Sequence, residues 1–211
     1  MLTHAFLDAV FIWSLGVDAL LIPRDPRVPR DTPDWSTLQC PDDSDTILPT
    51  PTYGGTGGIF TVCAELLINA PAELIYNTLI DFKSYHIWNS FVINVEVPSN
   101  VTNTPDDVYI NMPMTFTTSG LLPLINTTSD ETVTFLENDA DAGYLLNAWS
   151  ASVPSEHPNI LVSQGGGVTR YVSYETFYAP LGIAVLILKS ELQKQFEQQG
   201  EDLRTYVESM V

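Results

Sequence analysis

The order of the periodic segments constrains the fold of this chain more than any other feature of its sequence. An apolar, β-branched run at 59–69 is followed by two short stretches with helical spacing, at 72–81 and 85–91. Six more strand patterns come next, and a long amphipathic stretch at 181–209 ends the chain. The six strands are expected at 93–98, 108–118, 131–137, 144–152, 160–164 and 169–178.

This order predicts an α+β domain in which a seven-stranded antiparallel sheet curves around one long C-terminal helix. Clusters of turn residues, such as 127–130, separate the strand patterns. A strongly twisted sheet has one face to hide, and only one long helix is available to cover it. Because a curved sheet touches a helix along part of its length, we expect an apolar internal cavity, the usual form of a small-molecule site.

The residues before 59 are expected to lie outside that domain. Residues 5–22 form an apolar run about long enough to cross a bilayer, but Asp8 and Asp18 lie within it. On a helix, both acids fall in one polar stripe opposite a broad apolar face. This pattern favours residues 1–22 as a docking helix or lid over a membrane span or a signal peptide. Residues 23–58, rich in Pro and Gly, predict an extended strap, and the ligand-binding domain is expected at 59–211.

Charge and cysteine content exclude several partner classes. The formal net charge is −18, from 26 acidic and 8 basic residues, which argues against nucleic acid and anionic membranes. The only cysteines, Cys40 and Cys63, stand outside any metal-binding pattern, so no zinc site is expected. We expect two reduced thiols in a cytoplasmic protein, with a single disulfide as the alternative. Membrane association through residues 5–22 is the alternative location, and a homodimer formed through that helix is a possible assembly.

Two longer motifs resemble those of a known superfamily. The run 68–91, INAPAELIYNTLIDFKSYHIWNSF, contains a helix-opening proline followed by D-F-x-x-Y and W-N-x-F. The run 165–180, GGGVTRYVSYETFYAP, is similar to the last strand of the same group, with Ala179 in place of its usual glycine. Both resemble the polyketide cyclase/dehydrase and lipid-transport (SRPBCC) superfamily, which includes START domains, birch-pollen-allergen relatives and bacterial aromatic polyketide cyclases. The resemblance covers about 59–209 and implies the helix-grip, START-like fold, in a fungal-type member.

The resemblance also implies that Glu175 faces the cavity. A strand period of two then places Tyr171, Ser173 and Phe177 on the same wall, while Tyr174 and its alternating neighbours face away. A carboxylate on a half-apolar wall has a raised pKa and suits a general base, with Tyr171 as a second catalytic candidate. A hydrogen-bonded structural glutamate is the alternative interpretation.

The remaining candidates come from the helical stretch and the middle strands. His86, expected near the cavity mouth, is the third catalytic candidate, with a surface histidine as the alternative. His157 is expected at the surface. Candidate ligand-binding residues are Trp88, Met112, Met114, Phe116, Asn147, Trp149, Ser173 and Phe177. Ordinary core packing explains most of them equally well.

These observations lead to one functional hypothesis and one alternative. No nucleotide, metal or hydrolase motif is present, so no cofactor is expected. We expect the domain to bind a hydrophobic small molecule in an internal cavity. There it is expected to catalyse cofactor-independent cyclisation or rearrangement of a secondary-metabolite precursor of polyketide or terpenoid type. The alternative is a non-catalytic carrier of a lipid, sterol or quinone.

Overall fold

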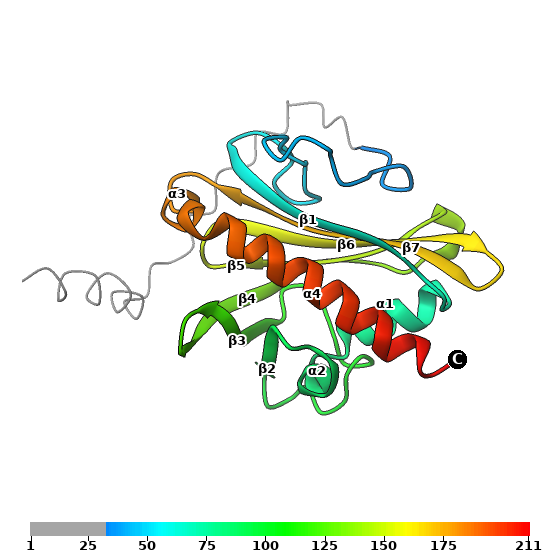
Figure 1. Cartoon of the computed structure of the whole chain (residues 1–211). Helices are drawn as coiled ribbons and strands as arrows, with labels where there is room; N and C mark the ends of the chain where they lie inside the picture. Colours follow the sequence, from blue (N-terminus) through cyan, green and yellow to red (C-terminus); the bar gives the residue numbers. More distant parts are fainter. Residues whose placement is uncertain (1–32) are drawn as a thin grey trace, which may run out of the picture. The chain divides into compact units, whose positions relative to one another are not determined.

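A computed structural model describes residues 33–211 of the chain (Figure 1). The expectations for residues 1–22, including the lid, the homodimer contact and the membrane contact, lie outside the described residues. The strands are β1 (Gly58–Ile68), β2 (Val92–Glu96), β3 (Pro113–Leu122), β4 (Ile125–Glu137), β5 (Leu145–Ala151), β6 (Ser155–Gly165) and β7 (Val168–Tyr178). The helices are α1 (Ala72–Ile80), α2 (Tyr85–Trp88), α3 (Gly182–Val185) and α4 (Lys189–Glu208), with 3-10 turns η2 (Phe82–Ser84), η3 (Ala140–Ala142) and η4 (Leu186–Leu188).

All seven strands form one antiparallel sheet in the order β1-β7-β6-β5-β4-β3-β2. The sheet curves around α4, which runs across its concave face (Figure 1). The predicted fold class, a seven-stranded antiparallel sheet around a long C-terminal helix, is therefore confirmed. The sheet places β1 and β2 at its two edges and β5 at its centre.

Four boundaries differ from the expectations. Residues 127–130, expected as a turn, lie within β4, and the β3–β4 hairpin turns instead between Leu122 and Ile125. Residues 108–112 precede β3 as irregular backbone with a turn at 110–111, and β6 begins at Ser155 rather than at Ile160. The predicted single C-terminal helix is divided, because α3 and η4 precede α4.

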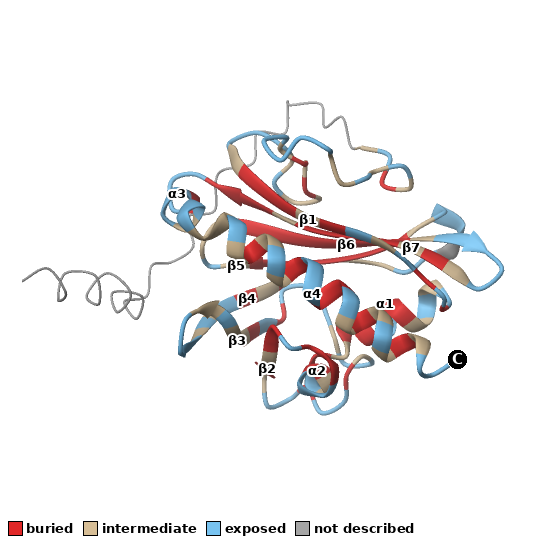
Figure 2. Ribbon diagram, in the orientation of Figure 1, coloured by how far each residue is buried: buried red, intermediate tan, exposed pale blue. Residues whose placement is uncertain are grey.

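A first hydrophobic core fills the layer between the concave face and α4. Buried residues recur along α4 (Figure 2), and their side chains belong to the same core cluster as those of the sheet. They include Leu192, Phe196, Leu203 and Val207. Gly200 allows the helix to approach the edge strand, because a Cβ at this position would lie 2.9 Å from Leu66 Cδ2.

A second core lies on the convex face, beneath the described part of the strap. Trp35 and Leu48 pack there in a cluster with Leu146, Ile160, Val172 and Tyr174. The strap backbone is also fastened by side chains of β7. Tyr174 Oη donates to Pro49 O at 2.6 Å, and Arg170 donates to Ser36 O and Leu38 O, both at 2.7 Å. Residues 33–57 thus cover the face of the sheet that α4 leaves open.

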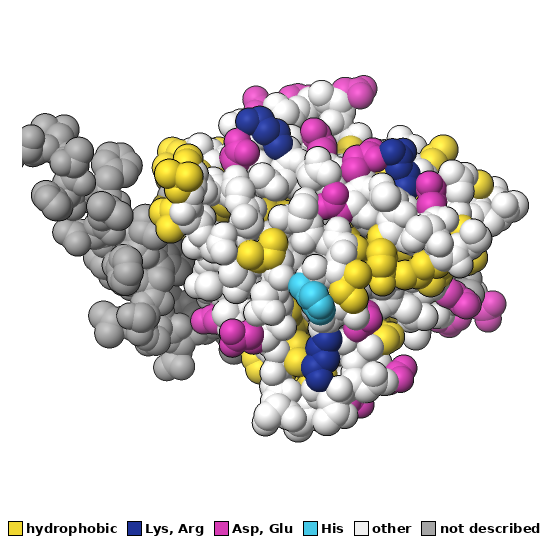
Figure 3. Space-filling view, turned by 60° about the horizontal axis from the view of Figure 1, so that its bottom comes forward, with side chains coloured by type: hydrophobic (Ala, Val, Ile, Leu, Met, Phe, Trp, Pro, Cys, Tyr) yellow, Lys and Arg dark blue, Asp and Glu magenta, His cyan; other side chains and the backbone are white. Residues whose placement is uncertain are grey.

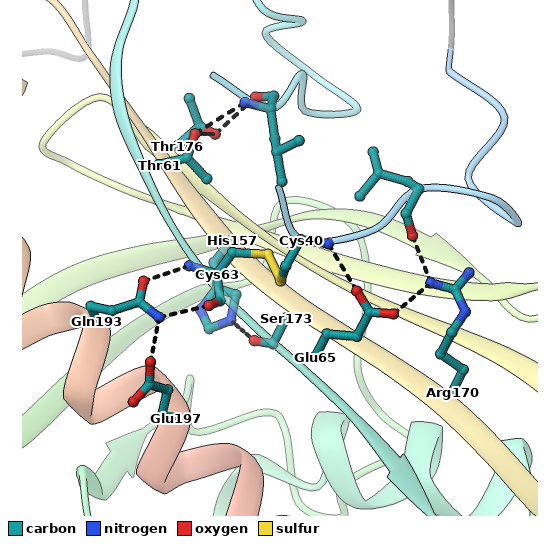
Figure 4. Close-up of a disulfide and its surroundings, with 12 residues drawn as sticks. Cys40, Thr61, Cys63, Glu65, His157, Arg170, Ser173, Thr176, Gln193 and Glu197 are labelled. Carbon is teal, nitrogen blue, oxygen red and sulfur yellow. Dashed lines mark hydrogen bonds and ion pairs between the residues drawn. A yellow bond between two sulfur atoms is a disulfide. The ribbon is translucent and has the colours of Figure 1, made fainter. Parts of the chain in front are cut away.

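A disulfide joins the strap to the edge strand (Figure 4). Cys40 and Cys63 are bonded, with their Cα atoms 5.7 Å apart, so the expectation of two reduced thiols is wrong. Gln193 of α4 bonds the backbone of Cys63 on both sides, accepting from its N at 3.0 Å and donating to its O at 2.7 Å. Because these bonds occupy edge groups that another strand would otherwise pair with, they protect β1 from edge-to-edge association.

Within residues 33–211, no helix is both long enough and apolar enough to cross a membrane.

Candidate functional site

Polar side chains from four strands enter the otherwise apolar layer between the sheet and α4. Strand register explains this arrangement, because Asn147 pairs with Asn159, and Asn159 pairs with Ser173. Trp149 and His157 form the next pair along the strands. Side chains two residues apart share a face, so these pairs extend as rows over the concave surface. The polar members are Glu131, Asn147, Ser155, His157, Asn159, Tyr171, Ser173 and Glu175.

Two carboxylates, Glu131 on β4 and Glu175 on β7, lie in this layer. Ser129 Oγ donates to Glu131 Oε1 at 2.7 Å, and Ser155 Oγ donates to Glu175 Oε1 at 2.6 Å. Burial raises the pKa of Glu131 to about 8, and the nearby charge of Glu175 adds to this rise. Burial also raises the pKa of Glu175 to about 7, although the hydrogen bond from Ser155 acts to lower it. None of the ion pairs among residues 33–211 involves either carboxylate.

His157 lies in the same layer, so the expectation of a surface histidine is wrong. Its ring centroid is 4.7 Å from that of Trp149 and 4.6 Å from that of Phe196, and its Nε2 is 2.8 Å from Ser173 Oγ. Burial lowers the pKa of His157 to about 3, so the imidazole is neutral near pH 7. Pro158 suggested a strand start after this residue, yet β6 begins before it. Residues 155–161 show no alternation of apolar and polar residues that would have indicated this position, which follows from the pairing of His157 with Trp149.

Tyr171, the second catalytic candidate, begins a buried chain of hydrogen bonds. Its hydroxyl donates to Asn159 Oδ1 at 2.6 Å, and Asn159 Nδ2 donates to Asn147 Oδ1 at 3.2 Å. Burial raises the pKa of Tyr171 well above its usual range, so the hydroxyl keeps its proton. Asn147 Nδ2 is buried and has no hydrogen-bond partner.

The structure divides the other catalytic and wall candidates between the interior and the surface. His86 lies exposed on α2, with Nδ1 3.0 Å from Lys83 O, which agrees with the alternative of a surface histidine. A catalytic role for His86 stays a prediction. Met112, Met114, Phe116, Trp149 and Phe177 are buried in the first core, as is Trp88, whose ring lies 4.9 Å from that of Tyr85. Their contact with a ligand stays a prediction.

Aromatic side chains occupy much of the space in which we expected an open cavity. The ring of Trp149 lies 5.6 Å from that of Phe82 and 5.9 Å from that of Phe116, in addition to its contact with His157. Two open hollows of the described chain lie elsewhere, where α4 meets the edge of β1 and where η4 meets the strap. A ligand in the interior therefore requires these rings to move.

On the face shown in Figure 3, acidic side chains are scattered over a mostly uncharged surface, and the Lys and Arg side chains stand apart from one another. The expectation that nucleic acid is not a partner stays a prediction.

Glu131 is the functional candidate that the sequence interpretation missed. The available signal was its place two residues before Val133 in the predicted strand 131–137, because residues two apart share a face.

Solved structures share the fold of this chain, whereas its sequence matches no known family. No family model and no curated protein matches the chain. A START superfamily protein from Mycobacterium smegmatis superposes with a TM-score of 0.56 at 14% identity, over 72% of this chain and 99% of that one. The Zhui aromatase/cyclase from Streptomyces gives a TM-score of 0.53 at 12% identity, over 70% and 93%. A STAR-related lipid transfer protein from Xanthomonas axonopodis gives 0.51 at 12%, over 69% and 84%.

At these identities the likeness concerns the fold alone. The expected START-like helix-grip fold is confirmed, whereas the narrower fungal-type assignment receives no support. Because the named neighbours include both a cyclase and a lipid transfer protein, the fold does not distinguish an enzyme from a carrier.

Proposed function

We propose that this chain binds an apolar small molecule between the concave face of the sheet and α4, and uses Glu175 and Glu131 for proton transfer during a cyclisation. The observation that carries the proposal is the pair of carboxylates held in an apolar layer without a cationic partner. Glu131 is 8% exposed, and its hydrogen-bond donor is a serine hydroxyl. Burying a carboxyl group in this way costs free energy that a purely structural role does not require.

The two buried carboxyl groups can act together as an acid and a base, because burial raises both of their pKa values toward neutral pH. With a pKa of about 8, Glu131 is mainly protonated at pH 7 and can donate a proton to a developing oxyanion. With a pKa of about 7, Glu175 is substantially ionised and can remove a proton from a carbon next to a carbonyl. The resulting enolate can close a ring by attacking a second carbonyl of the same molecule. Because burial brings both pKa values close to neutral pH, the two carboxyl groups can share one proton and exchange the roles of acid and base.

The apolar surroundings supply the rest of the proposed site. The tilted rings of Phe196 and His157 are in contact between α4 and the sheet, and their movement admits the ligand. Met112, Met114 and Phe116 then form an adaptable wall against it, since methionine side chains fit irregular shapes. Holding a flexible precursor in a folded shape lowers the entropic cost of ring closure.

A non-catalytic carrier is the second candidate, supported by the likeness to the STAR-related lipid transfer protein. The two candidates differ in what they require of Glu175. For a cyclase, Glu175→Gln keeps the shape of the side chain but reduces turnover of a linear poly-β-ketone by about tenfold or more. For a carrier, the same change leaves uptake and release of an apolar probe nearly unaltered.

The disulfide also bears on where the protein acts. Disulfides persist in oxidising compartments and are rare in the cytosol. The cytoplasmic location expected from the sequence rested partly on reduced thiols, and that support is removed. We therefore propose that the chain functions in an oxidising compartment. Alkylation of free thiols during lysis, followed by mass spectrometry, tests this: labelled Cys40 and Cys63 in the native host would contradict it.

Binding of a neutral fluorescent probe, N-phenyl-1-naphthylamine, tests the proposed site. We expect about 1:1 stoichiometry and a large loss of affinity in Ala64→Phe, because Ala64 is buried on the inner face of β1. Leu67→Phe, on the same strand but 58% exposed, is the matched control and should bind normally. Ile187→Ser removes apolar surface from the exposed turn η4. If Ile187→Ser abolished binding and Ala64→Phe did not, the probe would occupy the surface and the proposal would be wrong.

A further inference from the structure

A buried hydrogen-bond donor without an acceptor ends the Tyr171–Asn159–Asn147 chain. Tyr171, Asn159 and Asn147 are all fully buried. Because Asn159 Oδ1 accepts from the tyrosine hydroxyl, Asn159 presents Nδ2 to the next amide, and Asn147 accepts through Oδ1. The orientation of Asn147 follows from this chain, which leaves its Nδ2 as the free end.

The free donor faces the layer to which we assign the ligand. Asn147 lies on β5 two residues before Trp149, which contacts His157 and Phe116 in that layer. Leu145, two residues earlier on the same face, belongs to the first core. A buried N–H that bonds to nothing is unfavourable, so an acceptor from outside the protein is expected at Asn147 Nδ2.

The charges of the described residues indicate which kind of acceptor fits. Each Lys and Arg side chain of residues 33–211 bonds a group outside the layer: Lys83 bonds Thr102 O, Arg170 the strap, Lys189 Ser44 O, Lys194 Glu191 and Arg204 Glu201. The two titratable acids of the layer, Glu131 and Glu175, repel anions when ionised. A carboxylate or phosphate on the ligand is therefore disfavoured, and a neutral oxygen is favoured.

We propose that Asn147 Nδ2 donates a hydrogen bond to a carbonyl oxygen of the bound ligand, which is a neutral, mainly apolar ketone, quinone or ester. This inference rests on the proposed function and specifies the chemical class of its ligand. Tyr171 and Asn159 act as positioning residues, because they fix and polarise the amide that makes the contact. Trp88 Nε1, Asn89 Nδ2 and Gln199 Nε2 are also buried without a partner, but none of them ends the chain that begins at Tyr171. Gln199 of α4 serves as the comparison, because no such chain fixes its amide.

A matched pair of ligands isolates the carbonyl contact. 2-Acetylnaphthalene and 2-ethylnaphthalene differ mainly in the carbonyl group, and each can be titrated by displacement of N-phenyl-1-naphthylamine. The dissociation constant of 2-acetylnaphthalene, divided by that of 2-ethylnaphthalene, should rise by about threefold to tenfold from the wild type to Asn147→Leu, the range of one neutral hydrogen bond. The affinity for the hydrocarbon should stay nearly constant. In Gln199→Leu, which removes a buried amide of a different element, the ratio should keep its wild-type value.

The carbonyl stretching frequency of bound 2-acetylnaphthalene gives a second measurement. In the wild type it should lie below its value in cyclohexane, and in Asn147→Leu it should move toward that value. If Asn147→Leu does not fold, the wild-type frequency alone decides: a value matching cyclohexane overturns the proposal.

The possible failures are distinguishable. If neither naphthalene binds, the proposed function itself is wrong. If both bind and the affinity ratio is the same in the wild type and in Asn147→Leu, the protein binds apolar molecules but Asn147 does not recognise the carbonyl. In that case a buried water is the partner of Asn147, and the inference is rejected.

Discussion

Removing the Cys40–Cys63 disulfide should destabilise the domain by an amount set mainly by chain entropy. The bond joins residues 23 positions apart. Closing a loop of that length restricts the unfolded chain and is worth about 3 kcal/mol at 25 °C in the loop-entropy treatment. The double variant Cys40→Ser with Cys63→Ser should lose about this free energy of unfolding. It keeps the strap contacts of the folded state, such as the bond from Thr176 Oγ1 to Leu48 O at 2.8 Å.

Urea denaturation followed by far-ultraviolet circular dichroism measures this loss. The double variant should unfold at lower urea concentration, and its transition should be insensitive to a phosphine reductant. Addition of that reductant to the wild type should reproduce the variant's transition, which serves as the internal control. Equal unfolding free energies for oxidised wild type and double variant would contradict the reasoning. So would detection of two free thiols in the purified folded protein.

Two further predictions concern the interior. The pKa of Glu131 is raised from 4.5 to about 8 in the folded state, so the folded protein binds the proton more tightly, and stability should fall as pH rises from about 4.5 to about 8. Glu131→Gln should reduce this change in unfolding free energy by about 1 kcal/mol or more, measured by urea denaturation at several pH values. If the free energy of unfolding depended on pH as it does in the wild type, the burial of an uncompensated carboxyl group at Glu131 would be refuted. Gly200→Val should cost about 1–3 kcal/mol, because its Cβ would lie 2.9 Å from Leu66 Cδ2. Leu66→Ala in the same chain should recover part of that loss in thermal melts, and additive losses would show that the close approach of α4 is unimportant.

The faces of β7 could be predicted from sequence because alternation is clean there. Tyr171 and Phe177 point into the first core, and Val172 and Tyr174 point into the second, as period two requires. The element order was equally informative, since six strands between short helices and one long helix leave few ways to hide a sheet face.

Other features depend on contacts that a linear pattern does not contain. Pro158 lacks a backbone N–H donor, which suggested a strand boundary. In the structure it lies inside β6, between the pairs that Glu156 and Asn159 make with β7, where no donor to β7 is needed. That false boundary hid the inward position of His157. The Thr-rich residues 127–130 resembled a turn because they lie near an exposed hairpin, where neither face of the strand is fully buried.

The disulfide and the role of the strap required three-dimensional information. Cys63 faces outward on an edge strand, and Cys40 meets it only because the strap folds back over the convex face (Figure 4). Pro and Gly content indicated irregular backbone correctly but gave no indication of what Trp35 and Leu48 would cover.

The location of a bound apolar molecule tests the central claim most directly. Isotope-filtered nuclear Overhauser spectra can be recorded with unlabelled N-phenyl-1-naphthylamine and protein labelled at its methionine and isoleucine methyl groups. The account predicts contacts from the probe to Met112 and Met114, which are buried in the layer beneath α4. It predicts no contact to Ile187, which is 80% exposed on η4. Contacts to Ile187 without contacts to Met112 or Met114 would contradict binding between the sheet and the helix.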